Sequence, residues 1–224
     1  MPFPSVTRPA RPVIRTAQRT GAALAVLLCL AVSGCVEITE PTTPRPSGDT
    51  GDAKAQLEQL TVATAGSMRG YSRDRFPHWR SAGKNCDVRD TVLERDGTDV
   101  KLTGCNVVDG RWTSVYDQRS LSDPADVDID HMVPLANAWR SGADEWDDDR
   151  RGEFANDLTR PQLIAVSASS NRAKGDQDPA QWKPPSREFW CTYARDWIAV
   201  KHHWRLTVTK DEKAALIDML ETCT

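Results

Sequence analysis

The densest group of residues able to do chemistry is the pair Asp130-His131, followed later in the chain by Asn171. A carboxylate beside a histidine can hold a divalent cation while the imidazole faces and deprotonates a water molecule. An amide oxygen from a facing helix can complete the protein ligands, because Mg²⁺ often takes one or two protein oxygens and fills its other positions with water and phosphate. The pattern therefore predicts metal-assisted hydrolysis of a phosphate ester.

These side chains need a strand end and a helix to position them. Residues 127–134 alternate apolar and polar positions, and Pro134 stops strand pairing, so the segment predicts the end of a strand. A short helix is expected over 135–140. Ser167 can cap a further helix that carries the asparagine and ends at Gly175.

The remaining elements predict an α+β domain, in which short strands are embedded among helices. We expect a first helix over 52–68, a disulfide-closed turn between short elements over 86–105, a strand over 110–116, a helix capped by Ser186, and a last helix that opens with the capping box Thr209/Glu212.

The N-terminus is predicted to be an export leader. Four arginines precede the apolar run 21–32, which is shorter than the roughly 20 residues that a bilayer-spanning helix needs. The following 32–35 resembles the lipobox of bacterial lipoproteins, which implies a leader over 1–34 and acylation of Cys35. The alternative is an ordinary cleaved leader with an incidental cysteine. Residues 35–52 predict a disordered tether, and 53–224 a single domain.

Cysteine usage agrees with export. Beyond the leader and Cys35, four of the six cysteines remain, an even number that suggests two disulfides. Three pairings are possible, and we favour Cys86–Cys105 with Cys191–Cys223, because each pair brackets a compact segment. A zinc–thiolate site is not favoured, since the chain has no C-x-x-C motif.

Composition excludes several classes of protein. With 39% hydrophobic and 27% charged residues, the chain is neither a coiled coil, nor disordered throughout, nor a multi-span membrane protein. The leader holds four arginines and no acids, so its removal changes the formal net charge from -3 to -7. That balance argues against a tight general binder of duplex DNA, although 150–210 is locally basic.

Four segments carry a resemblance to a known family: 128–135 (DIDHMVPL), 154–158 (FANDL), 165–176 (AVSASSNRAKGD) and 178–185 (DPAQWKPP). With them the chain resembles the HNH (ββα-metal) endonucleases. It is most similar to exported bacterial HNH proteins related to the C-terminal domain of GmrSD-type nucleases. The resemblance runs from about residue 71 to 223, and implies a ββα-metal core embedded in a mainly helical, disulfide-stapled domain.

The resemblance also implies roles for single residues. His131 matches the general base, and Asp130 and Asn171 match the ligands of one divalent ion. Because the last ligand is an asparagine and not a histidine, Mg²⁺ or Mn²⁺ fits better than Zn²⁺. Arg172 and Lys174 are candidates to bind substrate phosphate, or they form a solvated helix end.

The residue that orients the base has two candidates. Asn156 is the family-like choice, whereas Gln162 lies at the more usual spacing before Asn171. The separation of His131 from Asn171 exceeds that of a minimal motif, so an insertion over 139–151 is expected to loop out.

These observations predict an exported endonuclease, lipid-anchored in the cell envelope through Cys35, that uses one divalent ion to cut nucleic acid. DNA is favoured over RNA, and no protein partner is predicted. The alternative is a non-catalytic cell-surface lipoprotein that binds nucleic acid or envelope glycan.

Overall fold

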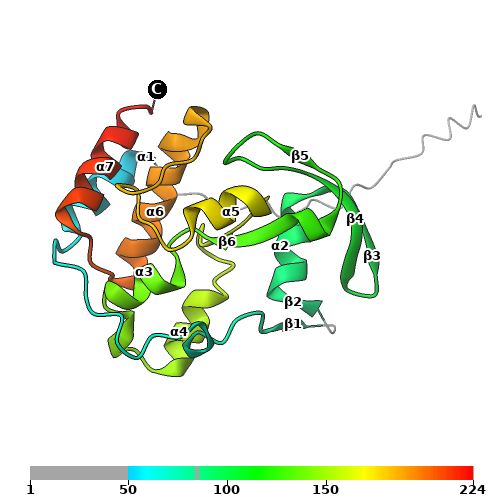
Figure 1. The fold of residues 1–224 in the computed structure, drawn as a ribbon, viewed down its shortest axis with the longest axis horizontal. Helices are drawn as coiled ribbons and strands as arrows, with labels where there is room; N and C mark the ends of the chain where they lie inside the picture. Colours follow the sequence, from blue (N-terminus) through cyan, green and yellow to red (C-terminus); the bar gives the residue numbers. More distant parts are fainter. Residues whose placement is uncertain (1–49, 84–85, 224) are drawn as a thin grey trace, which may run out of the picture. The chain divides into compact units, whose positions relative to one another are not determined.

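The computed structural model describes residues 50–83 and 86–223 (Figure 1). The expected leader, Cys35 and most of the expected tether lie outside these residues. The last part of that tether, 50–52, instead begins the first helix.

The described chain mixes helices with small antiparallel sheets. Its helices are α1 (Thr50–Gln59), α2 (Val88–Asp96), α3 (Leu135–Arg140), α4 (Asp148–Ala155), α5 (Ala168–Lys174), α6 (Trp190–Trp204) and α7 (Lys210–Leu220). Its strands are β1 (Ser81–Gly83), β2 (Cys86–Asp87), β3 (Thr98–Thr103), β4 (Asn106–Thr113), β5 (Ser120–Leu121), β6 (Val127–His131) and β7 (Leu163–Ser167). Short 3-10 turns include η1 (Arg73–Arg75) and η3 (Ala143–Glu145). The expected α+β class is confirmed at this level.

Strands β6 and β7 pair antiparallel, and α5 follows β7 without an intervening loop. Their register places Asp130 opposite Ile164 and His131 opposite Leu163. Ser167 ends β7 and caps α5 through a hydrogen bond from the N–H of Ser170 to its Oγ (3.2 Å). Figure 1 shows α5 (yellow) beside β6 (green), and the helix packs against both strands.

The outer edge of β7 is held by α2. Its Arg95 donates from Nη2 to the carbonyl of Leu163 (2.7 Å), and the N–H of Ala165 donates to Asp96 Oδ2 (2.9 Å). The capping box Asp87/Asp90 that starts this helix was not recognised in the sequence, where a disulfide-closed turn between short elements was expected over 86–105.

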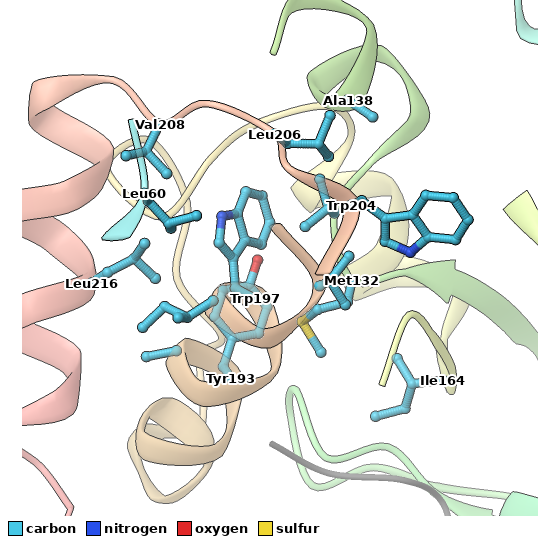
Figure 2. Close-up of a cluster of buried hydrophobic side chains, with 14 of the residues drawn as sticks. Leu60, Met132, Ala138, Ile164, Tyr193, Trp197, Trp204, Leu206, Val208 and Leu216 are labelled. Carbon is cyan, nitrogen blue, oxygen red and sulfur yellow. The ribbon is translucent and has the colours of Figure 1, made fainter. Parts of the chain in front are cut away.

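The largest part of the core surrounds α6, as Figure 2 shows. Tyr193, Ala194, Trp197 and Ile198 are fully buried, as the apolar stripe predicted. Helices α1 and α7 pack on α6. The last helix has the expected capping box between Thr209 and Glu212.

The first helix is shorter than predicted. It ends at Gln59, whereas the sequence analysis carried it to 68. The β-branched residues that follow favour extended backbone. Val62 forms a parallel bridge with Val208, and the N–H of Ala63 donates to the carbonyl of Val208 (2.9 Å).

The prediction that 139–151 loops out is wrong. These residues form the end of α3, the η3 turn and the start of α4, and Trp139 and Arg151 are buried. Arg151 donates to the carbonyls of Arg75 (2.9 Å) and Ala143 (3.1 Å). The insertion is therefore an integral part of the fold.

Both favoured disulfides are formed. Cys86 pairs with Cys105 and Cys191 with Cys223, and the Cα atoms of each pair are 5.0 Å apart. The first ties the start of α2 to the β3–β4 turn, and the second joins α6 to the end of α7.

Candidate active site

A cavity of about 210 Å³ brings together three of the predicted site residues. Asp130 and His131 reach it from the end of β6, and Asn171 reaches it from α5. Ile129 of β6 also lines it, and the remainder of the lining comes from residues before and after β6 and α5: Tyr71, Arg73, Pro134, Leu135, Ala136, Gly175 and Asp176. The antiparallel register and the direct start of α5 thus place side chains that are distant in sequence around one space.

His131 is buried and held by a backbone carbonyl. Its Nε2 lies 2.9 Å from the carbonyl oxygen of Ala155, at the end of α4. A carbonyl only accepts, so Nε2 carries the proton and Nδ1 is the basic nitrogen. Burial, with smaller effects from Arg73 and His78, lowers the pKa of His131 to about 3. The imidazole is therefore neutral near pH 7, which is the form that can accept a proton.

An aromatic side chain supports the same ring. The indole of Trp79 stacks on His131 with ring centroids 5.8 Å apart and an interplanar angle of 23°. Trp79 has a left-handed backbone (φ 55°), a conformation that costs a non-glycine residue energy and has to be held by its surroundings. The sequence analysis gave Trp79 no role, and no motif pointed to one.

Asn156 holds the segment that carries Trp79. Its Oδ1 accepts from the N–H of Arg80 (2.9 Å), and its Nδ2 donates to the carbonyls of Pro77 (2.8 Å) and Gly152 (2.7 Å). Residues 77–80 are named the indole loop below. Asn156 thus contacts the loop on both sides of Trp79, and the recorded partner of the imidazole Nε2 is the neighbouring Ala155 carbonyl.

Gln162, the other candidate to orient the base, lies just before β7. It is fully buried, and its amide pairs with Val133 in both directions, accepting from the N–H (3.1 Å) and donating to the carbonyl (3.0 Å). These contacts hold the backbone just after His131. Within the described residues, neither the Asn156 amide nor the Gln162 amide forms a hydrogen bond with the imidazole.

Asp130 is a buried carboxylate with one oxygen engaged. Its Oδ2 accepts from Tyr116 Oη (2.6 Å) and from Lys174 Nζ (2.6 Å). Within the described part of the chain no hydrogen bond to Oδ1 is recorded. Burial raises the pKa of Asp130, whereas the charge and hydrogen bond of Lys174 oppose the rise.

Lys174 occupies a different place from the one expected for a phosphate contact. Its side chain is 0% exposed, and Nζ also donates to the carbonyls of His131 (2.8 Å) and Met132 (3.1 Å). The ammonium group is therefore internal and faces Asp130, so it is neither a solvated helix end nor open to substrate. Arg172, in contrast, keeps 76% of its side chain exposed and lies 3.9 Å from Asp128.

The amide of Asn171 has a defined orientation. Its Nδ2 donates to Asp128 Oδ2 (3.1 Å). An ionised carboxylate only accepts, so this contact requires the amide nitrogen on that side and directs the carbonyl oxygen away from Asp128. Asn171 also lines the cavity, where an amide oxygen can act as a ligand.

Arg73 is a cavity residue for which the sequence analysis proposed no role. Its Nε donates to Nε2 of His78 (3.2 Å), and His78 Nδ1 in turn donates to the carbonyl of Phe76 (2.6 Å). The guanidinium is exposed at η1 and lines the cavity. The basic and aromatic composition of 73–79 was visible in the sequence, but only the fold places it beside His131.

No cluster of three or more His, Cys, Asp or Glu side chains suited to a metal ion occurs in residues 50–83 and 86–223. None of the helices formed by these residues is long and apolar enough to cross a membrane.

Comparison with known proteins gives a family for the chain. The family model of the C-terminal domain of GmrSD restriction endonucleases matches residues 87–219, which is more than half of the sequence. A protein of Arthroderma benhamiae, described as an uncharacterized secreted protein, is 52% identical over 185 residues, covering 82% of this chain and 90% of that protein. No solved structure matches. These matches do not support the bacterial lipoprotein type, and Cys35 lies outside the described residues. The matched range runs from β2 to α7 and includes every residue of the cavity lining except Tyr71 and Arg73. Over this range the chain belongs to the GmrSD restriction endonuclease C-terminal domain family.

Proposed function

We propose that this protein is a divalent-metal-dependent endonuclease that hydrolyses phosphodiester bonds of nucleic acid outside the cytoplasm, with DNA as the favoured substrate. The observation that carries the proposal is the shared cavity of Asp130, His131 and Asn171, in a chain of the GmrSD C-terminal domain family. The antiparallel pair β6 and β7, followed directly by α5, supports the proposal, because a ββα-metal core would have its elements in this order.

The residues at the cavity suit a hard, oxygen-binding cation. Asp130 offers Oδ1, and Asn171 offers the amide oxygen that faces away from Asp128. One carboxylate and one amide are a small ligand set, typical of Mg²⁺, which keeps several water molecules. When bound, such an ion would supply charge stabilisation for the phosphate and the leaving oxygen.

His131 would act as the general base. Its Nδ1 takes a proton from a water molecule, whose oxygen forms the new bond to phosphorus while the bond to the leaving oxygen breaks. The leaving oxygen takes a proton from solvent. The Ala155 carbonyl and the Trp79 ring keep the imidazole oriented, and the arrival of a phosphate anion raises the pKa of His131 from its low value.

Two arginines are placed to contact substrate. Arg73 lines the cavity, and Arg172 is exposed on α5. Guanidinium groups bind phosphate oxygens with paired hydrogen bonds, so these two side chains would hold the nucleic-acid backbone across the cavity.

The test is a cleavage panel with the exported protein, using supercoiled plasmid, single-stranded DNA and RNA, each with Mg²⁺, Mn²⁺ or EDTA. We expect cutting with Mg²⁺ or Mn²⁺ and none in EDTA. His131→Ala should lower the rate about 100-fold or more, as loss of a general base does. The matched control is His202→Ala on α6, whose ring contacts Gln59 and not the cavity.

Two outcomes would refute the proposal. One is the absence of cutting of all three substrates with either ion. The other is undiminished cutting by His131→Ala. Binding of nucleic acid without metal or turnover would favour the alternative of a non-catalytic binding protein.

Export is supported by the leader-like N-terminus, the two disulfides and the description of the relative as secreted. Acylation of Cys35 is a separate proposal that rests on the lipobox-like sequence 32–35. If Cys35 is acylated, Cys35→Ser will move the protein from the membrane fraction to the soluble fraction. Unchanged partitioning would exclude the anchor.

A further inference from the structure

Lys174 is the last residue of α5, and its side chain ends beneath the carboxylate of Asp130. The ammonium group donates to Asp130 Oδ2, to the carbonyl of His131 and to that of Met132. These partners use all three of its N–H groups. It therefore has a complete set of acceptors, and all three partners belong to β6 or the turn that follows it.

This contact decides the charge of the proposed metal site. Asp130 and Lys174 are both buried, so a charge on either group needs a partner of opposite charge close by. Lys174 Nζ lies 2.6 Å from Asp130 Oδ2 and provides that partner. The carboxylate is thus compensated before any metal ion arrives, and only Oδ1 is left for one.

A second buried ion pair offers an internal comparison. Lys201 Nζ lies 2.7 Å from Glu212 Oε1 and donates to Ser141 Oγ (3.1 Å) and the Thr207 carbonyl (2.8 Å). The two lysines are equally buried, and each ammonium lies near the Trp197 ring, at 5.9 Å for Lys174 and 5.6 Å for Lys201. Neither Lys201 nor Glu212 lines the cavity.

We propose that Lys174 is a built-in counter-ion of Asp130, which keeps the metal site assembled in the absence of metal and weakens its affinity for the divalent ion. The inference rests on the proposed function, because it concerns the same site. Oδ2 serves the ammonium and Oδ1 remains for the divalent ion, so both cations share one carboxylate and repel each other. The contacts with the carbonyls of His131 and Met132 make Lys174 a positioning residue for the strand end as well.

The experiment measures Mn²⁺ binding by calorimetry and thermal unfolding in EDTA, for the wild type and Lys174→Met. Methionine keeps the length and apolar character of the side chain but removes its charge. We expect Lys174→Met to bind Mn²⁺ at least tenfold more tightly, and to unfold at a lower temperature in EDTA. Added Mn²⁺ should recover more of the lost unfolding temperature than it adds to the wild type.

Lys201→Met is the matched control, since it removes an equally buried ammonium from a pair outside the cavity. It should lower the unfolding temperature while changing the Mn²⁺ dissociation constant less than twofold. Tyr116→Phe removes the other hydrogen bond to Asp130 Oδ2 without changing any charge near neutral pH. Its Mn²⁺ affinity should therefore change much less than that of Lys174→Met.

If the uncompensated carboxylate prevents folding, Lys174→Met will be obtained in folded form only with Mn²⁺. For that outcome the double variant Asp130→Asn, Lys174→Met removes both charges. Folding of the double variant in EDTA, where the single variant does not fold, would support the counter-ion role. Failure of both variants to fold would mean that Lys174 acts through packing, and would overturn the inference.

The remaining outcomes separate the two proposals. If the wild type binds Mn²⁺ and cuts DNA, and Lys174→Met binds Mn²⁺ equally well or more weakly, only the counter-ion role is overturned. If neither protein binds Mn²⁺, the metal site is refuted together with the counter-ion role. If only Lys174→Met binds Mn²⁺, the counter-ion role is supported and the proposed metal dependence of the wild type is refuted.

Discussion

At the scale of single residues, the candidate site depends on the effect of burial on the charges of two adjacent side chains. Asp130 and His131 follow one another on β6 and are both buried. Asp130 has a cationic partner in Lys174, so its charge is compensated. His131 has a neutral carbonyl partner, so burial disfavours its protonated form. The same depth in the protein therefore places a carboxyl group paired with Lys174 beside a neutral base.

Burial of His131 makes a prediction about stability and pH. Its folded pKa of about 3 lies below the ordinary value of 6.5, so in the window between them the unfolded chain binds the proton more strongly. In EDTA, the free energy of unfolding should fall as pH drops from 6.5 toward 3, by up to about 4 kcal/mol from this group. His131→Asn should lose less stability over that window, as measured by urea unfolding.

The control for this titration is His202→Asn, which removes a histidine bonded to Gln59 away from the cavity. This variant keeps His131, so it should retain the loss of stability that burial of His131 produces. A profile of His131→Asn that is just as steep as the wild type would mean that His131 does not contribute the predicted loss.

At the scale of elements, the end of α4 orients the base from two directions. Ala155 provides the carbonyl for His131, and Asn156 holds the indole loop whose Trp79 covers the same ring. Helix α4 begins within 139–151, the range that was expected to loop out. The end of this helix therefore supplies the support that keeps the imidazole in one orientation.

Removal of the Asn156 amide tests this arrangement. Asn156→Ala loses three hydrogen bonds, so it should destabilise the fold by roughly 2–4 kcal/mol. A displaced indole loop should also lower kcat about 10-fold or more through misorientation of His131, with KM changed less than about threefold. Steady-state cleavage kinetics below the unfolding temperature measure both constants.

Asn137→Ala is the comparison for that experiment, because it also removes a buried amide, one that accepts from Ser141 Oγ and does not contact the indole loop. It should cost stability and leave kcat near the wild-type value. Equal kcat values for Asn156→Ala and Asn137→Ala would contradict a positioning role for Asn156.

At the scale of the whole molecule, two disulfides close loops of different length. Cys86 and Cys105 are 19 residues apart, and Cys191 and Cys223 are 32 residues apart. The second joins the start of α6 to the end of the chain, and neither cysteine lines the cavity. Its contribution should therefore be to the stability of the helical core and not to the geometry of the site.

The double variant Cys191→Ser, Cys223→Ser tests that separation. In the loop-entropy model it should lower the free energy of unfolding by about 4 kcal/mol, against about 3 kcal/mol for the Cys86, Cys105 double variant. Urea unfolding gives both values. Specific cleavage activity of the former at 25 °C should match the wild type, and a large loss of activity would contradict the assignment.

Local sequence determined those features that depend on neighbours along the chain. The cap at Ser167, the end of α5 at Gly175, the capping box at Thr209 and the apolar stripe of α6 could all be predicted, because each arises within a few residues. The two disulfides also followed from their spacing. The motifs around Asp130 and Asn171 indicated the family, which the match over 87–219 confirms.

Tertiary structure decided what each polar group contacts. The sequence predicted Lys174 as a phosphate contact or a solvated helix end, yet packing of α5 on β6 buries it against Asp130. The partner of His131 is a backbone carbonyl, which any residue type at position 155 could provide. No side-chain pattern in the sequence therefore indicates this contact. Trp79 lies far from His131 in sequence and reaches it from a loop that Asn156 holds. Contacts of this kind depend on which segments fold against each other, and burial then sets the charge of the groups that meet.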